Sequence, residues 1–399
     1  MKILWILGEL PIPADSGGKL RVLGLLKELA PRHEITVVVL DPGETESHHL
    51  AELRALCHRV EVLPWQGRRS KLQLILGAIC HLFSHLPFAV IKYCSEETER
   101  KLTQLLSAPY DLVQCESFCF YRYLSHPTTA KKILNTQNIE AAIWQQRAQL
   151  CTNPFLRFYL NSQARKMAQY ESWIIEKYDS VLAVSDEDAA ILKTRYRAKS
   201  VAVVPNGVEV FALLPGLKAE PGLIVFSGAM DYTPNDDAMH YFLRDVWPLI
   251  VQKYPAARFK IVGRRPSRTL RAMVARHTNV EITGWVEEVR PFLARAAVVV
   301  VPLRMGGGTR IKILEAMALG KPIVSTSIGA ENLGVVPEQH LLLADTPLAF
   351  IEKTVFLLEN SDLGRKIGQT AREFVEANYS WRICARRLNE IWQKNLQTK

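Results

Sequence analysis

Three ionisable side chains that follow a run of glycines are the residues of this sequence best suited to chemistry. Arg310, Lys312 and Glu315 come directly after the segment Gly306-Gly307-Gly308-Thr309. Glycines let backbone N–H groups approach an anion, and two nearby cations can bind phosphate oxygens. A carboxylate in apolar surroundings needs hydrogen-bond donors, and vicinal sugar hydroxyls are such donors. The segment therefore predicts a site for a sugar diphosphate.

The same residues have a simpler interpretation. Lys312 and Glu315 are three residues apart, so they would form an ordinary surface ion pair if the helix were solvated. The diphosphate site is favoured because a strand-end loop, a helix cap, two cations and a carboxylate coincide within one short stretch.

The elements around this stretch explain how it is positioned. Residues 298–301 are four consecutive valines, which predicts a strand covered on both faces, as in a parallel sheet. The glycine loop then follows the carboxyl end of this strand. Ligands bind at that end of parallel strands. Thr309 as N-cap, Gly320 after the last turn and Pro322 as a stop predict a helix over 310–319. This helix is apolar almost all round, so we expect it to be buried.

A second glycine pair follows the first strand of the sequence. Gly17 and Gly18 lie close to the start of a predicted helix, where they would approach the same diphosphate from the opposite side. On spacing alone a simple turn is the more common explanation. The loop has neither the glycine pattern of a Walker loop nor that of a dinucleotide-binding turn.

Hydrophobic strands alternate with helical stretches along the whole chain, which predicts an α/β fold with doubly wound parallel sheets. The strands expected in the first half are 3–7, 35–40, 60–63, 112–115, 133–136, 181–184 and 201–204. Those expected in the second half are 223–226, 259–262, 280–283, 298–301, 322–325 and 341–344.

The chain of 399 residues is too long for one ordinary core. Pro205-Asn206-Gly207 and the proline- and glycine-rich stretch 214–222 predict a hinge. We therefore expect a first domain over 1–206, a second domain over 207–379, and a C-terminal helix over 380–399 that packs back on the first domain. Strand-end loops of the two domains are expected to line a cleft.

Composition narrows the partners and the compartment. The net charge of +10 suits an anionic partner such as a nucleotide sugar or acidic lipids, and no nucleic-acid-binding motif is found. Seven cysteines without a Cys-x-x-Cys pair, and a first strand unlike a signal peptide, predict a cytoplasmic protein. The apolar segment 72–86 follows three cations, so it is either a core helix or a peripheral anchor on the inner face of the membrane.

Three stretches, at 181–188, 203–209 and 308–324, resemble the group 1 (family 4) glycosyltransferases, in particular their bacterial polysaccharide-associated branch. The resemblance implies a GT-B fold, with two Rossmann-like domains facing a central cleft. It makes 1–206 the acceptor-side domain and 207–379 the nucleotide-sugar domain. It also implies a retaining, hexosyl-type transferase for polysaccharide or glycolipid synthesis. The donor would be a nucleoside-diphosphate sugar, with no other cofactor, and the hydroxyl acceptor would be a carbohydrate, a lipid-linked molecule or a small molecule.

The resemblance assigns roles by position. Glu315 would hold the ribose hydroxyls, Arg310 and Lys312 the diphosphate, and Gly17 and Gly18 would approach that diphosphate from the first domain. The positions that would flank the base are Gly263, Arg264, Trp285 and Val286. The remaining substrate-binding positions are Asn206, Gly228, Gly307, Gly308 and Thr309.

Two departures from the family pattern keep other functions open. Gly307 stands where many relatives have a glutamate, and Gln137 stands where many have a histidine. Gln137 cannot act as a base, yet it can hydrogen-bond the donor sugar, so it is grouped with the catalytic residues. The alternatives are a nucleotide-sugar epimerase on the same scaffold and a non-catalytic nucleotide-sugar-binding protein.

Asp186 and Asp188 have the spacing of a metal-binding Asp-x-Asp pair. Because they follow Ser185, they are interpreted as the acidic first turn of a helix, where the dipole favours negative charge. No metal is expected.

Overall fold

The computed structural model describes residues 1–41, 46–64, 84–91, 93, 95–124, 128–151, 153–210, 217–305 and 310–397. Most of the segment 72–86, and the predicted binding residues Gly307, Gly308 and Thr309, lie outside these ranges. Among the described residues, no helix has both the length and the apolar character that crossing a bilayer requires.

The chain forms two compact units. Unit 1 comprises Met1–Pro205 and Cys384–Lys399, and unit 2 comprises Asn206–Ile383. The chain therefore leaves unit 1 near the predicted hinge and returns to it through its last helix. The acceptor and donor roles expected for the two domains stay predictions.

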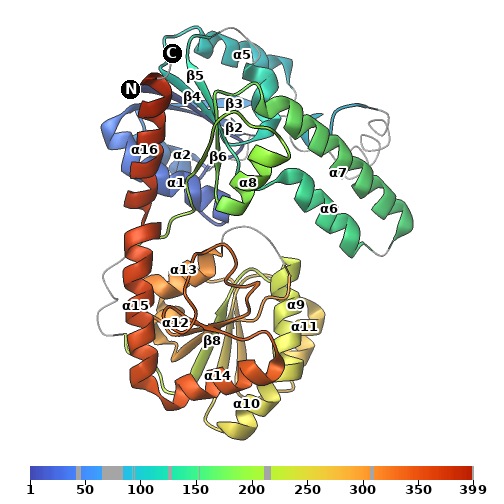
Figure 1. The fold of residues 1–399 in the computed structure, drawn as a ribbon, viewed down its shortest axis with the longest axis vertical. Helices are drawn as coiled ribbons and strands as arrows, with labels where there is room; N and C mark the ends of the chain where they lie inside the picture. The colour runs from blue at the N-terminus through green and yellow to red at the C-terminus, as the bar shows by residue number, and fades with distance from the viewer. Residues whose placement is uncertain are drawn as a thin grey trace. The chain divides into compact units, whose positions relative to one another are not determined.

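Unit 1 is built on a parallel sheet of seven strands in the order β3-β2-β1-β4-β5-β6-β7. Helices lie on both faces of the sheet (Figure 1). The strands are β1 (Lys2–Leu7), β2 (Glu34–Asp41), β3 (Arg59–Pro64), β4 (Leu112–Cys115), β5 (Lys131–Asn135), β6 (Ser180–Ala183) and β7 (Val201–Val203). The helices are α1 (Gly17–Leu29), η1 (Ala30–Arg32), α2 (Ser47–Leu56), α4 (Phe88–Ile91), α5 (Glu96–Leu106), η3 (Phe118–Leu124), α6 (Glu140–Leu150), α7 (Pro154–Ile175), α8 (Asp186–Thr194) and most of α16 (Trp381–Gln397).

Unit 2 is built on a parallel sheet of six strands in the order β10-β9-β8-β11-β12-β13. The strands are β8 (Leu223–Ser227), β9 (Arg258–Val262), β10 (Val280–Gly284), β11 (Val298–Val301), β12 (Ile323–Ser325) and β13 (Leu342–Leu343). The helices are α9 (Thr233–Tyr241), the π-helix η4 (Phe242–Val246), α10 (Trp247–Lys253), α11 (Arg268–Val274), α12 (Arg290–Arg295), α13 (Ile311–Ala318), α14 (Pro347–Glu359) and α15 (Ser361–Tyr379).

The prediction of two doubly wound α/β sheets is confirmed. In each sheet the strand order reverses beside the first strand of the unit, between β1 and β4 and between β8 and β11. Such reversals open a crevice at the carboxyl ends of the strands, which is where doubly wound proteins bind ligands. We therefore expect a binding site at the loops that follow β1, β4, β8 and β11.

The helix expected over 310–319 is shorter in the structure. α13 spans Ile311–Ala318, and Arg310 occupies the cap position with φ −82° and ψ 62°, outside the helical region. Gly320 has φ +65°, the left-handed conformation that commonly ends a helix and that glycine adopts without strain.

Candidate active site

Helix α13 carries three of the predicted catalytic residues at the strand reversal of unit 2. Its side chains Ile313, Leu314, Ala316 and Met317 are fully buried, which fixes the helix in the core. Arg310 is only 5% exposed, while Lys312 and Glu315 are partly buried. The structure thus holds two cations and a carboxylate beside one another in a poorly hydrated setting.

Lys312 is held by three neighbours. Its Nζ donates a hydrogen bond to Asn235 Oδ1 at 2.6 Å and lies 4.3 Å from the ring centroid of Phe226. The Asn235 amide is oriented for this contact because its Nδ2 donates to the carbonyl of Ala229. At Gly228 a Cβ atom would lie 2.7 Å from Lys312 Nζ, so this position needs glycine. The predicted binding residue Gly228 therefore lies against the cation.

The pKa of Lys312 is lowered to about 7. Burial is the largest cause and Arg310 adds to it, whereas Glu315 opposes the change. An ammonium group that has lost much of its hydration gains most when an anion approaches it. A bound phosphate would restore its charge.

The pKa of Glu315 is shifted in the opposite direction to that of Lys312. Burial raises the pKa of its carboxyl group to about 7, and Lys312 and Arg290 oppose this rise. Within the described ranges, no residue donates a hydrogen bond to this carboxylate, which is partly exposed. A carboxylate in this state can accept hydrogen bonds from ligand hydroxyls.

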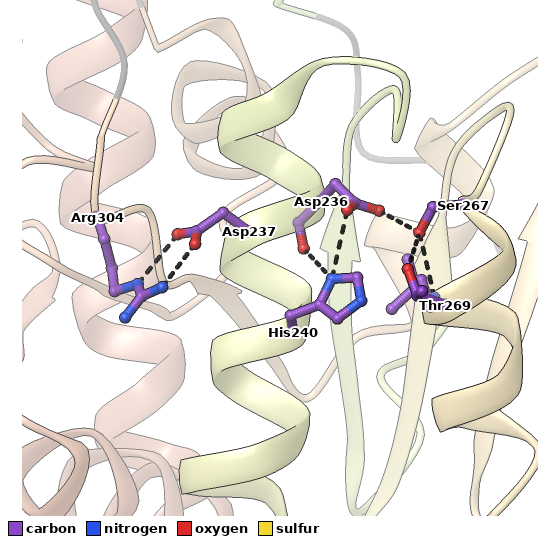
Figure 2. Close-up of polar contacts among 7 residues, drawn as sticks. Asp236, Asp237, His240, Ser267, Thr269 and Arg304 are labelled. Atoms are coloured by element: carbon purple, nitrogen blue, oxygen red, sulfur yellow. Dashed lines mark hydrogen bonds and ion pairs between the residues drawn. The ribbon is translucent and has the colours of Figure 1, made fainter. Parts of the chain in front are cut away.

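The two residues that flank the segment 305–309 are each held by an ion pair. Arg310 lies 3.6 Å from Glu331, and burial lowers its pKa while Glu331 raises it. Arg304 donates to both carboxylate oxygens of Asp237, at 3.0 and 2.6 Å (Figure 2). Its guanidinium lies 4.8 Å from the centroid of the Tyr241 ring. Helix α9 thereby holds Arg304, the residue just before the segment 305–309.

The neighbouring acid of α9 has a similar structural role. Asp236 accepts a hydrogen bond from Ser267 Oγ at 2.8 Å and lies 3.4 Å from His240 Nδ1. Ser267 Oγ in turn accepts the N–H of Leu270 and so caps α11. Figure 2 shows these contacts linking α9 to the loop after β9. Asp236 thus holds the start of α11 after β9, and Asp237 holds Arg304 after β11.

The residues predicted to flank the base lie on the other side of β8. At Gly263 a Cβ atom would lie 1.8 Å from the carbonyl oxygen of Gly228, so only glycine lets the ends of β8 and β9 approach. Arg264 lies 3.8 Å from a carboxylate oxygen of Asp231. Trp285 is 70% exposed after β10.

The remaining predicted residues that the structure describes in unit 2 are Val286 and Asn206. Val286 packs, partly buried, against the core of the unit. Asn206 is buried at the first position of unit 2. Within the described chain, no hydrogen bond or ion pair links Trp285 or Val286 to α13.

Unit 1 has a separate cavity of about 400 Å³ at the ends of β1, β4 and β5. It is lined by Gly18, Lys19, Glu116 and Gln137, with Tyr93 on its wall. Gly17 is the first residue of α1 and Gly18 the second. A Cβ atom at Gly18 would lie 2.4 Å from Gln137 Oε1, so the glycine is what lets Gln137 approach the helix start. Two residues predicted from distant motifs are therefore brought together.

Glu116 is the residue of this cavity that sequence analysis missed. Its carboxylate accepts hydrogen bonds from Trp5 Nε1 at 2.6 Å and Asn135 Nδ2 at 2.8 Å, and from Gln137 Nε2 at 3.3 Å. Its only signal in the sequence is its position, directly after the buried strand β4. Sequence periodicity alone does not show that β4 lies between β1 and β5.

The fully buried Arg21 connects this cavity to the end of unit 1. Its guanidinium donates to Asn135 Oδ1 at 3.1 Å and to the carbonyl of Pro205 at 2.9 Å. Burial lowers its pKa and Glu116 raises it. The pair Asp186 and Asp188 lies, as expected, in the first turn of α8, with Ser185 as the cap.

Comparison with known proteins shows which family and which relatives this chain is similar to. Residues 221–360 match the family described as "Glycosyl transferases group 1". An uncharacterised 44.6 kDa protein of the cps region of Klebsiella pneumoniae is 24% identical over 95% of this chain and 96% of its own length. A phosphatidyl-myo-inositol mannosyltransferase of Mycobacterium tuberculosis is 26% identical over 55% of this chain and 60% of its length.

Solved structures share the whole fold at low sequence identity. Sucrose-phosphate synthase from Thermosynechococcus elongatus has a TM-score of 0.73 and 16% identity, with all of both chains covered. Anabaena HepE in complex with UDP and glucose has a TM-score of 0.66 and 15% identity, covering 99% of this chain and 100% of that one. With its two parallel sheets this chain has the GT-B fold of these structures, and residues 221–360 of unit 2 match the group 1 glycosyltransferases.

Proposed function

We propose that this protein transfers a hexosyl group, with retention of configuration, from a nucleoside-diphosphate sugar to a hydroxyl acceptor in polysaccharide or glycolipid synthesis. The observation that carries the proposal is the cluster of Arg310, Lys312 and Glu315 at the strand reversal of unit 2. It offers two poorly hydrated cations for a diphosphate, and beside them a carboxylate for ribose hydroxyls.

The chemistry assigned to these residues is electrostatic. Negative charge grows on the diphosphate as the bond to the sugar breaks, and cations fixed beside it stabilise that charge without needing to reorganise. We assign this role to Lys312 and Arg310 and propose that they act without a metal ion. Removing one such donor typically lowers the rate by about 100- to 1,000-fold.

We assign the cavity of unit 1 to the sugar part of a substrate. Its lining combines the amide of Gln137, the carboxylate of Glu116 and the ammonium of Lys19, which are groups that hydrogen-bond hydroxyls. The N–H groups of Gly17 and Gly18 lie at the start of α1, where an anion is favoured. Gln137 orients a hydroxyl in this proposal and does not act as a base.

The relatives support the same substrate classes. HepE was crystallised with UDP and glucose, the mycobacterial relative is named for mannosyl transfer to a phosphatidylinositol, and the Klebsiella relative is encoded in a cps region. We therefore propose a carbohydrate or lipid-linked acceptor. A cytoplasmic location agrees with the five described cysteines, which are free.

Thermal unfolding in the presence of a panel of nucleoside-diphosphate sugars is the first test. The correct donor raises the melting temperature by mass action. That donor is then incubated with and without extracted lipid and oligosaccharide acceptors, and the products are identified. Transfer that needs an acceptor supports the proposal, a changed sugar nucleotide in its absence shows an epimerase, and binding without any product shows a non-catalytic protein.

A further inference from the structure

Helices α6 and α7 form an antiparallel pair in unit 1 (Figure 1). The tip of this pair carries exposed apolar side chains. Phe155 is 87% exposed, Phe158 is 70% exposed and Leu156 is 50% exposed. Single exposed apolar residues are common on proteins, but three within four positions of one helix form a contiguous patch. Such a patch marks an interaction surface.

The first turn of α7 holds these side chains in place. Asn153 Oδ1 accepts the N–H groups of Phe155 and Leu156 at 3.0 and 3.1 Å, and Arg157 Nε donates to the carbonyl of Cys151 at 2.9 Å. The patch is therefore presented by a capped helix.

The base of the pair is fixed as well. Fully buried Glu171 on α7 accepts the N–H of Glu140, the first residue of α6, at 2.7 Å. The hydroxyl of Tyr196 donates to the same carboxylate at 2.7 Å. The two helices consequently form a rigid arm, and ordering it at a partner costs little conformational entropy.

The charge of the arm indicates which class of partner it binds. Between residues 141 and 170 there is no aspartate or glutamate, and there are four cations: Arg147, Arg157, Arg165 and Lys166. Three of these, the arginines, are exposed, and no carboxylate among the described residues pairs with them. Helical spacing puts Arg165 on the same side of α7 as Phe155 and Phe158.

From this combination we infer that the tip of the α6–α7 pair docks on an anionic lipid bilayer. Aromatic side chains enter the boundary between headgroups and acyl chains, and the arginines contact anionic headgroups. A second copy of this chain would bring like charges together at the patch, which disfavours self-association. The inference depends on the surface of unit 1 and is independent of the function proposed for α13.

Vesicle flotation tests the inference on the full chain. The wild-type protein is expected to bind vesicles that contain about 30% phosphatidylglycerol at least about tenfold better than pure phosphatidylcholine vesicles. The double variant Phe155→Ser/Phe158→Ser is expected to lose about tenfold or more of the binding to the anionic vesicles. The variant Arg147→Gln/Arg165→Gln should lose the preference for anionic lipid.

Leu348→Ser is the matched control, because Leu348 is 61% exposed on α14 of unit 2 and should leave vesicle binding unchanged. Unchanged melting temperatures show that each variant is folded. Three results overturn the inference: no binding of the wild type to anionic vesicles, equal binding by the double phenylalanine variant, or a concentration-dependent dimer that this variant abolishes. Equal binding would point to another surface, such as the segment 72–86.

Discussion

At the scale of single residues, burial in the same surroundings shifts the pKa values of Lys312 and Glu315 in opposite directions. Burial lowers the pKa of Lys312 and raises that of Glu315, both to about 7. The charged forms that bind a nucleoside diphosphate are therefore both less favoured here than in water. Ligand binding restores them, because phosphate stabilises the ammonium and hydroxyl donors stabilise the carboxylate.

The pH dependence of kcat/KM follows from these two groups. Below pH 7 Glu315 becomes protonated and loses acceptors for hydroxyls, and above pH 7 Lys312 loses its charge. A bell-shaped profile with its maximum near pH 7 is expected, and its two limbs belong to the interacting pair. Lys312→Arg should extend the alkaline limb because a guanidinium stays charged. A flat profile between pH 6 and 9, roughly the range in which such groups titrate, would contradict this assignment.

Gly18 makes a steric prediction about Gln137. The Cβ of Gly18→Ala would lie 2.4 Å from Gln137 Oε1, so the amide must move. If Gln137 orients a substrate hydroxyl, transfer should fall about tenfold. The nearest side-chain atoms at this position all belong to Gln137, so Gly18→Ala should have little further effect in a Gln137→Ala background. Additive losses in the double variant would show that Gly18 acts through something else.

The residues of the α13 cluster were predictable because their types and spacing fall in one short segment after a strand. Glu116 was not, because its partner Trp5 comes from β1, and its partners Asn135 and Gln137 come from the end of β5 and the loop after it. Only the order of β1, β4 and β5 in the sheet places these residues around one carboxylate. A site can thus be predicted from the sequence when its residues lie in one short segment, and not when they come from segments far apart.

At the scale of elements, the strands were the most predictable part of the fold. A strand covered on both faces needs an unbroken apolar run, and β11 with its four valines is such a run. Helix ends were harder to predict. Arg310, one residue after the expected N-cap, has a non-helical backbone conformation, and its buried side chain lies 3.6 Å from Glu331.

Helix α9 is predicted to support the site through its ion pair with Arg304. Asp237→Asn removes the charge that holds Arg304 just before the segment 305–309, so the dissociation constant for the donor should rise about two- to fivefold. Asp362→Asn breaks an exposed pair with Arg365 at the start of α15 and serves as the control. Isothermal titration of both variants checks this, and equal affinities in the two would exclude an anchoring role.

At the scale of the whole molecule, unit 1 is completed by the last helix of the chain. Trp392 on α16 is fully buried, donates to Gln114 Oε1 at 2.8 Å and packs edge-to-face on Trp5, with ring centroids 5.8 Å apart. Sequence analysis expected the return of this helix to the first domain. The tryptophan contacts that hold it lie more than 270 residues apart in sequence and could not be predicted.

Loss of this contact should destabilise unit 1. Trp392→Ala removes a large buried side chain and is expected to lower the free energy of unfolding by about 3–5 kcal/mol. Trp173, which is 50% exposed, provides the control, and Trp173→Ala should cost much less. Denaturant unfolding measures both. A similar small loss in the two variants would mean that α16 does not stabilise the unit.

The central claim for the whole molecule is that Glu315 holds the ribose of a nucleotide donor. Its most direct test is a double-mutant cycle that combines Glu315→Gln with removal of a ribose hydroxyl, using the nucleoside diphosphate that binds best and its 2′-deoxy and 3′-deoxy analogues. Glu352→Gln, an exposed substitution on α14, is the control. In the wild type and the control, loss of the contacted hydroxyl should weaken binding about tenfold or more, and in Glu315→Gln it should have a much smaller effect. Equal losses with and without the Glu315 carboxylate would contradict the claim.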